Sequence, residues 1–141
     1  MTTIWIIFVA IVCISSMIYT LVNYKKHNAK LAKFAEEHPE AAKVYIKTTK
    51  IGIIVDTLTV HDVDGEEPLI FNEMLIKDGF YLIPGKHVLE LSYQWTRPGI
   101  IYKTITNYLD PCKIEVEAEA NKIYNLYYNK KQKQYVFEEI R

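Results

Sequence analysis

Apolar and polar residues follow two different patterns along this chain, and the change comes near residue 43. Residues 4–22 form an apolar run without a charged side chain, and the first charged residue anywhere is Lys25. Wound as an α-helix, this run extends roughly 29 Å, close to the thickness of a bilayer's hydrocarbon core. From Lys43 onward, short apolar stretches recur about every ten residues between turn-forming residues, a spacing typical of an all-β domain.

The apolar run predicts an uncleaved transmembrane anchor over residues 1–23, with residues 4–22 in contact with membrane lipid. A cleaved signal peptide would begin with a basic segment and end in a small-residue motif such as Ala-x-Ala. Here Met1-Thr2-Thr3 carries no basic side chain, and no Ala-x-Ala follows. We therefore expect a protein that crosses the cell (inner) membrane once.

Small and polar residues form a stripe along the predicted span. Cys13, Ser16 and Thr20 fall on one side of a helix with Asn23, within about 80° of arc. Spans often pack against each other through such residues, so these positions are candidates for self-association in the membrane. The alternative is that polar residues are simply common near the ends of spans, where their hydroxyl groups bond back to their own helix.

Residues 24–42 predict a juxtamembrane helix and linker. Tyr24–Glu37 is rich in helix-forming residues, and Pro39 disfavours helix at the residue before it, so the helix should end near His38. Four lysines in this segment precede the first acidic residue, Glu36. Because positive charge accumulates on the cytoplasmic side of a span, we expect the C-terminal domain in the cytoplasm. The alternative orientation is a signal anchor that places the domain outside.

Residues 43–141 predict an antiparallel β-sandwich of about eight strands. The expected turns are Asp64-Gly65, Lys77–Gly79, Pro84-Gly85, Thr96–Gly99 and Asn121-Lys122. The expected strands are Val44–Thr48, Ile53–Val60, a short pair or irregular edge within Leu69–Ile76, Phe80–Ile83, His87–Trp95, Ile100–Tyr108, a strand that begins at Asp110-Pro111, Ile123–Tyr128 and Gln134–Ile140.

Strict alternation sets the register of two of these strands. Leu89, Leu91 and Tyr93 point to one face of their strand. Ile114 and Val116 share the inner face of another, with glutamates opposite. A slip of one residue would bury those glutamates, so the pairing should be strongly specified.

Parts of this domain resemble a known group of folds. The run VDG … GFYLIPGKHVLELSY … KIEVEAEANKIYNLYYN … YVFEE resembles small bacterial PEGA-like and carboxypeptidase-regulatory-like modules with transthyretin-like topology. The matching positions are Asp64-Gly65, Pro84-Gly85, Val88–Tyr93 and Tyr124–Leu126. The resemblance implies a β-sandwich that is not catalytic and that binds proteins or cell-envelope polymers, or spaces other parts.

Composition and motifs argue against most kinds of chemistry. Lys and Arg together number 17, as do Asp and Glu, so there is no overall charge to favour nucleic acid. No pairing of a nucleophile with a base, no phosphate loop and no metal-ligand spacing is present. The acidic loop Asp62–Glu67 lacks the spacing of a calcium loop, and we expect a plain hairpin turn there. Cys13 and Cys112 belong to different parts of the chain, so no intramolecular disulfide is expected. We predict no catalytic residue, cofactor or metal.

Aromatic and cationic residues are the remaining candidates for a contact. Trp95, Arg97 and Pro98 lie in a predicted turn, where side chains usually face solvent, and Trp and Arg are common in binding hot spots. For most other aromatic residues a place in the core is the simpler interpretation. We therefore expect a non-catalytic, membrane-anchored module that binds a protein partner or itself. The alternative is an envelope-side module that binds glycan or peptidoglycan.

Overall fold

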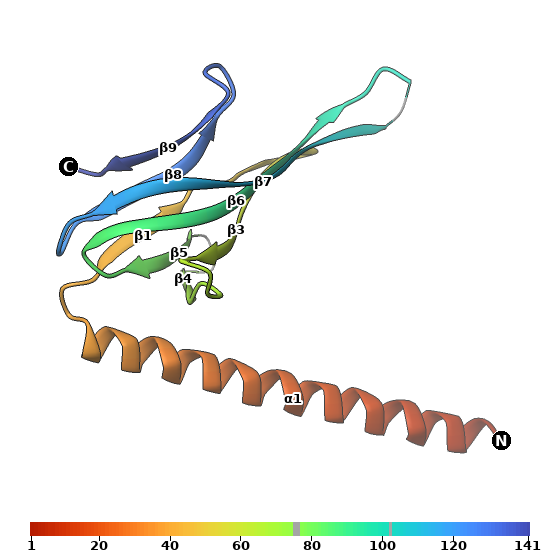
Figure 1. The fold of residues 1–141 in the computed structure, drawn as a ribbon. Helices are drawn as coiled ribbons and strands as arrows, with labels where there is room; N and C mark the ends of the chain where they lie inside the picture. The colour runs from red at the N-terminus through yellow and green to blue at the C-terminus, as the bar shows by residue number, and fades with distance from the viewer. Residues whose placement is uncertain (75–76, 102) are drawn as a thin grey trace. The chain divides into compact units, whose positions relative to one another are not determined.

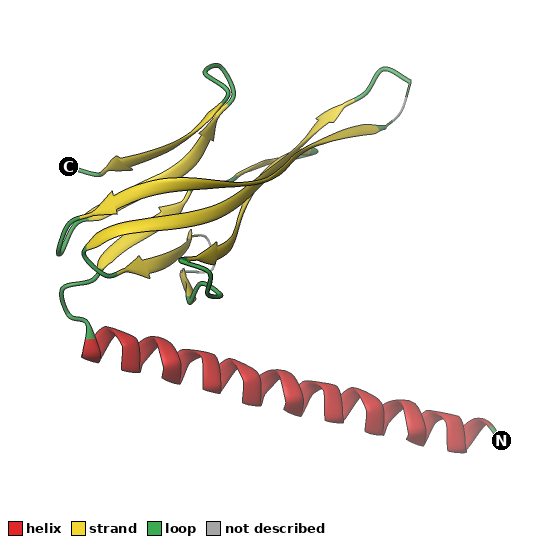
Figure 2. Ribbon diagram, viewed as in Figure 1, coloured by secondary structure: helices red, strands yellow, loops and turns green. Residues whose placement is uncertain are grey.

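The computed structural model describes residues 1–74, 77–101 and 103–141 of the chain (Figure 1). It divides into two compact units, Met1–Glu37 and His38–Arg141. The first unit is a single helix, and the second, called here the strand domain, is built of β-strands joined by short turns (Figure 2).

The helix α1 runs without a break over Thr2–Glu37. It is long and apolar enough to cross a membrane, and its most apolar window has a mean hydropathy of 2.4. The hydroxyl groups of Ser15 and Thr20 donate to the carbonyl oxygens of Val12 and Ser16, each at 2.9 Å. These bonds within the helix lower the cost of placing hydroxyl groups in lipid. The helix ends one residue before His38, as Pro39 predicts.

The strand domain holds nine strands among its described residues, arranged in two sheets. One sheet has five strands in the order β4-β5-β1-β8-β9, and the other has four in the order β2-β3-β6-β7. The strands are β1 (Ala42–Ile46), β2 (Thr49–Ile51), β3 (Ile54–Val63), β4 (Ile70–Glu73), β5 (Lys77–Leu82), β6 (Gly85–Pro98), β7 (Thr104–Ala118), β8 (Ile123–Asn129) and β9 (Gln134–Glu139).

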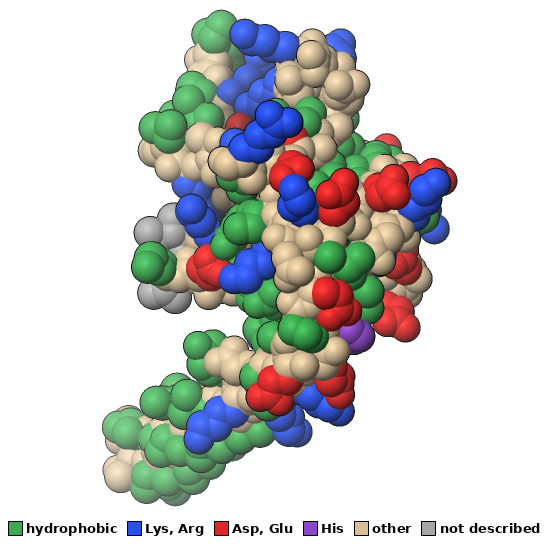
Figure 3. Space-filling model, turned by 90° about the vertical axis from the view of Figure 1, so that its left-hand side faces the viewer, with side chains coloured by type: hydrophobic (Ala, Val, Ile, Leu, Met, Phe, Trp, Pro, Cys, Tyr) green, Lys and Arg blue, Asp and Glu red, His purple; other side chains and the backbone are tan. Residues whose placement is uncertain are grey.

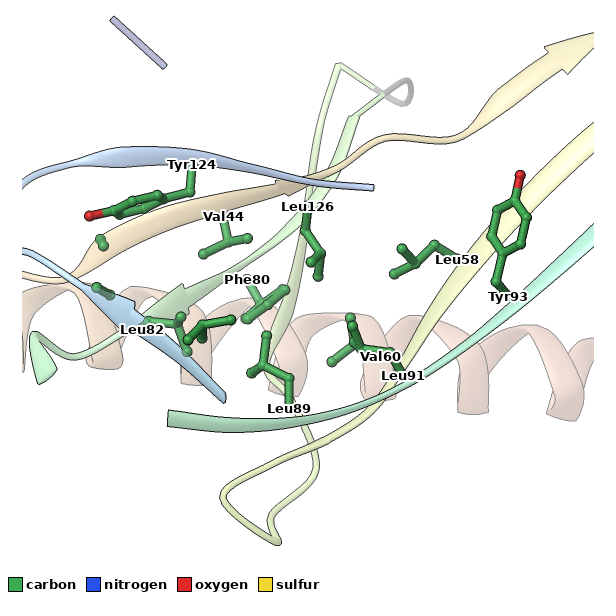
Figure 4. Close-up of a cluster of buried hydrophobic side chains, with 13 residues drawn as sticks. Val44, Leu58, Val60, Phe80, Leu82, Leu89, Leu91, Tyr93, Tyr124 and Leu126 are labelled. Carbon is green, nitrogen blue, oxygen red and sulfur yellow. The ribbon is translucent and has the colours of Figure 1, made fainter. Parts of the chain in front are cut away.

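The hydrophobic core lies between the two sheets (Figure 4). The five-stranded sheet contributes side chains such as Val44, Phe80 and Leu126, and the four-stranded sheet contributes Leu89 and Leu91. These five side chains are at most 1 % exposed. The alternation predicted for β6 and β7 therefore holds, because their inward-facing residues are the ones that are buried.

The predicted β-sandwich is confirmed, with nine strands rather than eight and one departure from antiparallel pairing. β1 and β8 run parallel, with Val44 opposite Tyr124. Within the described residues the chain changes sheets four times, between β1 and β2, β3 and β4, β5 and β6, and β7 and β8. The last two changes fall at the predicted turns Pro84-Gly85 and Asn121-Lys122, and they bring β8 back beside β1.

Two predicted turns and one predicted strand boundary are wrong. Lys77–Gly79 forms the first half of β5 and pairs with β4 and β1. Thr96–Pro98 continues β6, opposite the start of β7. Asp110-Pro111 lies in the middle of β7, so two expected strands are one. Turn-forming residue types do not end these strands, because the residues that flank them pair with neighbouring strands. The edge expected within Leu69–Ile76 contains β4, and residues 75 and 76 lie outside the described residues.

Gly79 has a packing role that the sequence did not reveal. A methyl group at this position would come within 2.6 Å of both the Phe71 ring and the carbonyl oxygen of Val44. Phe71 is the cross-strand partner of Gly79, and its ring lies over the glycine and is 7 % exposed. The absence of a side chain at residue 79 thus lets the aromatic ring cover the backbone.

We expect Gly79→Ala to lower the free energy of unfolding by about 1–3 kcal/mol, because the added methyl group overpacks this contact. Urea unfolding of the detergent-solubilised chain, followed by circular dichroism, measures the change. Adding Phe71→Leu should restore part of the loss, since it removes one of the two clashes. A fully stable Gly79→Ala variant would contradict this account.

The turn after β3 is the tight hairpin expected at Asp64-Gly65. Both residues have positive φ, 55° and 83°, and Val63 and Glu66 exchange two backbone hydrogen bonds. The Asp64 carboxylate accepts from the Val88 amide at 2.8 Å and from His87 Nδ1 at 2.6 Å. The other ring nitrogen of His87 faces the carbonyl oxygen of Ile83 at 2.5 Å. The His87 ring thus lies between the Asp64 carboxylate and the Ile83 carbonyl oxygen, which ties the turn after β3 to the start of β6.

These bonds predict how stability changes in acid. The Val88 amide and then His87 hold the pKa of Asp64 below its ordinary value, so this stabilisation is present above about pH 4 and is lost as pH falls through the lowered pKa. Asp64→Asn, which tolerates the positive φ, should flatten the fall in the urea midpoint below about pH 4. Equal acid dependence of the two proteins would show that Asp64 does not contribute.

Candidate interaction surface

The four-stranded sheet extends beyond the five-stranded sheet at one end. β6 and β7 have 14 and 15 residues, whereas β1 and β8 on the opposite layer have 5 and 7. In Figure 1 the paired ends of β6 and β7 extend to the upper right, away from the strands of the other sheet. Among the described residues, no strand of the five-stranded sheet lies beside the outer part of this hairpin, and Arg97 and Pro98 at the end of β6 are exposed.

A β-bulge separates the packed half of this hairpin from the projecting half. Leu91 pairs with Cys112 and Tyr93 with Leu109, so two residues of β7, Asp110 and Pro111, lie opposite Ser92 alone. Bulges accommodate proline, which has no amide hydrogen, and they increase the local twist of a strand. The predicted strand boundary at Asp110-Pro111 is therefore a point where one long strand changes direction.

Exposed isoleucines occupy the tips of two neighbouring hairpins at this end. Because Val55 pairs with Thr96, the β2–β3 turn lies close to the level of the β6–β7 turn. Ile100 is fully exposed, and Ile101 and Ile51 are 88 % and 70 % exposed. Among the described residues, the exposed isoleucines of the two tips are Ile51, Ile53, Ile54, Ile100 and Ile101.

The same end of the domain is strongly cationic. We define the basic end as the described part of residues 47–55, 94–109 and 129–134. The sequence of these segments contains no carboxylate, and its cationic residues are Lys47, Lys50, Arg97, Lys103, Lys130, Lys131 and Lys133. The adjoining carboxylate, Asp56, is held by Lys130 Nζ at 2.8 Å. In Figure 3 the Lys and Arg side chains gather at the top of the strand domain.

The opposite end of the strand domain is acidic. We define the acidic end as residues 62–67, 84–90, 113–122 and 138–139, which carry ten Asp or Glu residues against three lysines. The linker enters the domain here, where the Asn121 amide donates to the Glu40 carbonyl oxygen at 2.9 Å. The balanced charge of the whole chain therefore conceals a domain with two oppositely charged ends.

An open hollow of about 410 Å³ lies at the base of the projecting hairpin. It is lined by Trp95, Leu109, Tyr128, Lys130 and Lys133. Its walls thus combine two aromatic side chains with two cations, where the interior of the sandwich opens toward the basic end.

Aromatic rings close the core behind this hollow. The Tyr93 ring stacks on Trp95 at 5.5 Å between centroids and lies 4.6 Å from Tyr128. Burial, and then the Asp56 carboxylate, raise the pKa of Tyr93. Tyr93 marks the limit of the buried cluster, at the right-hand side of Figure 4.

The structure places the predicted contact residues in the projecting hairpin, though not in a turn. Trp95 is half-buried on the inner face of β6, whereas Arg97 and Pro98 are exposed at its end. Tyr102, a further aromatic residue near these positions in the sequence, lies outside the described residues. The predicted membrane contacts Cys13, Ser16 and Thr20 are all exposed on α1.

Sequence reasoning missed the exposed isoleucines and the segregation of charge. Both features are visible in hindsight, because residues 47–55 and 94–109 contain isoleucines and cations without a single acid. The sequence did not show that these two segments lie side by side, since that depends on the pairing of β3 with β6.

A cluster of titratable groups on the five-stranded sheet is held together by hydrogen bonds to Glu73. Glu73 accepts from the Tyr45 hydroxyl at 2.8 Å and from Lys43 Nζ at 3.2 Å. The hydrogen bond from Tyr45, and then Lys43, lower the pKa of Glu73, although burial opposes this. Burial and then Glu73 raise the pKa of Tyr45. An activated Tyr would need a lowered pKa, and a poised Glu base a raised one.

Searches against protein families, curated proteins and solved structures return no match for this chain. Within the described residues, no group of three or more His, Cys, Asp or Glu side chains is placed to hold a metal ion. The chemistry of the basic end itself, with apolar tips, cations and an aromatic hollow, is suited to binding.

We expect Ile100→Ser combined with Ile101→Ser to leave the melting temperature almost unchanged, because side chains exposed to this extent contribute no burial. Leu91→Ala should lower the free energy of unfolding by about 2–5 kcal/mol, because Leu91 is fully buried. Thermal unfolding in detergent measures both variants. A strongly destabilised double variant would show that the tip isoleucines serve the fold.

Proposed function

We propose that this protein is a non-catalytic, membrane-anchored module that presents a β-sandwich for contact at a membrane surface. In this proposal α1 stays in the cell membrane, with residues 4–22 in lipid, and the strand domain displays the basic end. A mean hydropathy of 2.4 and the absence of charge from residues 4–22 support the anchor.

The lysines that follow the span support a cytoplasmic position for the strand domain. Lys25, Lys26, Lys30 and Lys33 all lie on α1 beyond residue 22 and precede any acidic residue. Positive charge at this place disfavours transfer of the flanking segment across the membrane. Self-association through Cys13, Ser16 and Thr20 is part of the same proposal, since small and polar residues permit close approach of two spans.

The observation that carries the proposal is the unprotected half of β7. β7 is an edge strand of its sheet, so one side of its backbone has no neighbouring strand. Its second half carries Lys113, Glu115 and Glu117, the kind of charge that discourages pairing with another chain. Its first half, Thr104–Leu109, is uncharged and rich in residues that favour strands. This half is suited to pairing with an extended segment of a partner or of a second copy.

The aromatic hollow favours a second candidate function, the binding of an envelope glycan. Trp95 and Tyr128 offer faces on which a sugar ring can stack, and Lys130 and Lys133 would attract its acidic groups. This function requires the strand domain outside the cytoplasm. Orientation therefore separates the two candidates.

Three measurements on the full chain test the proposal. We expect the protein to remain in membranes after carbonate extraction, and a reporter fused after Arg141 to be active only in the cytoplasm.

A photo-crosslinking residue in place of Thr106, on the exposed edge strand, should capture a partner or a second copy. The matched control replaces Glu117 in the charged half of β7 and should capture none. Release by carbonate would overturn the anchor, and equal capture from both positions would overturn the edge as the contact.

A further inference from the structure

We propose that the basic end docks on the anionic headgroup surface of the membrane that holds α1. The tip isoleucines would enter the boundary between headgroups and acyl chains, and the cations beside them would bind lipid phosphates. This inference rests on the proposed membrane anchor and adds a second, reversible lipid contact made by the strand domain.

The order of residues along the two hairpins carries the proposal. Ile100 and Ile101 lie in the loop after β6, with Arg97 near the end of β6 and Lys103 directly before β7. Trp95 and Tyr108 come next, and such side chains favour the headgroup region. The β2–β3 hairpin repeats the pattern, with Ile51 and Ile53 outside Lys50.

The positive charge of the basic end favours an anionic bilayer over a neutral one. Seven cations and no carboxylate lie in the segments of the basic end, and Lys130 already neutralises the adjoining Asp56. Each Lys or Arg near an anionic bilayer contributes about 1 kcal/mol of attraction. A neutral bilayer offers the isoleucines the same apolar interior but no partner for the cations. Docking should therefore depend on anionic lipid.

The strands that lead to both tips are paired almost to their ends. β2 pairs with β3 as far as Ile51 and Ile54, and β6 pairs with β7 as far as Pro98 and Thr104. Because these strands satisfy each other's hydrogen bonds, they bring few unpaired backbone groups toward the lipid. In Figure 1 the β6–β7 hairpin extends beyond the end of β3, so its isoleucines would enter the bilayer first.

The lengths of the parts permit contact with the membrane that holds the anchor. About 15 residues of α1 follow the span and extend roughly 22 Å beyond the lipid. β6 alone is roughly 46 Å long, and the basic end lies at its far end from the linker. A domain of this length, attached through residues 38–41, is able to return its basic end to the bilayer.

The full chain in lipid nanodiscs provides the test. A polarity-sensitive dye on Ile100→Cys, with Cys13→Ser and Cys112→Ser, reports whether the tip leaves water. We expect a blue shift, and quenching by lipids brominated in their acyl chains, in nanodiscs of phosphatidylcholine mixed with phosphatidylglycerol. The shift should be absent in phosphatidylcholine alone and should be reversed by high salt. A dye on Glu67→Cys, at the acidic end, should report water in every case.

Matched charge variants sharpen the test. Lys50→Gln, Arg97→Gln and Lys103→Gln together should reduce the docking constant on the order of a hundredfold, at about fivefold per charge. Lys86→Gln, Lys113→Gln and Lys122→Gln, which remove the lysines of the acidic end, should leave docking intact.

The remaining outcomes would overturn the inference. These are an unshifted tip dye in phosphatidylglycerol nanodiscs, an equal shift in phosphatidylcholine alone, and an equal response to inorganic phosphate. A tip dye that shifts only on addition of a soluble acidic protein would assign the surface to a protein partner instead. If the chain fails to stay in the nanodisc at all, the anchor fails and not the docking step.

Discussion

The burial of one shared apolar layer between two sheets of unequal length is the constraint on which the strand domain depends. Where both sheets are present, Leu89, Leu91 and Phe80 pack between them and leave almost no apolar surface exposed. Beyond Trp95 and Leu109, which still pack against the core, β6 and β7 continue toward a loop in which Ile100 and Ile101 are exposed. The domain therefore has a compact half that supplies stability and an extension that is free to make other contacts.

Two irregularities in strand pairing lie near the boundary between the compact half and the extension. The bulge opposite Ser92 lies at the boundary between the packed and projecting parts of β6 and β7. Ser92 itself is buried and bonded to the His61 ring at 2.7 Å, and a second irregularity in β3 falls at His61. Both bulges thus occur at one level of the sheet. Bulges increase the local twist of a strand at the cost of a few unpaired residues, and pairing resumes on both sides of each bulge here.

The charged residues are segregated in the same way, so that the domain has one acidic end and one cationic end. The carboxylates collect around the linker and the Asp64 turn, and the cations collect around the exposed isoleucines. In the proposed setting, lysines that follow the span and cations at the far end of the domain are both attracted to anionic lipid. The acidic end would be repelled, which favours a pose in which the projecting hairpins face the membrane. The open edge of β7 would still be available to a protein in that pose.

The sequence by itself determined the helix and the two-layered β architecture, because both follow from local periodicity. An uncharged run of helical length predicts α1, and alternation places Leu89 and Val116 inside. It also located Trp95 and Arg97 as candidates, although it assigned them to a turn. Only the tertiary structure decided that Thr96–Pro98 remains paired, that Asp110-Pro111 is a bulge, and that β1 lies parallel to β8. Only the pairing of β3 with β6 in the four-stranded sheet brought residues 47–55 beside residues 94–109. Contacts between distant segments depend on which strands become neighbours and not on any local pattern.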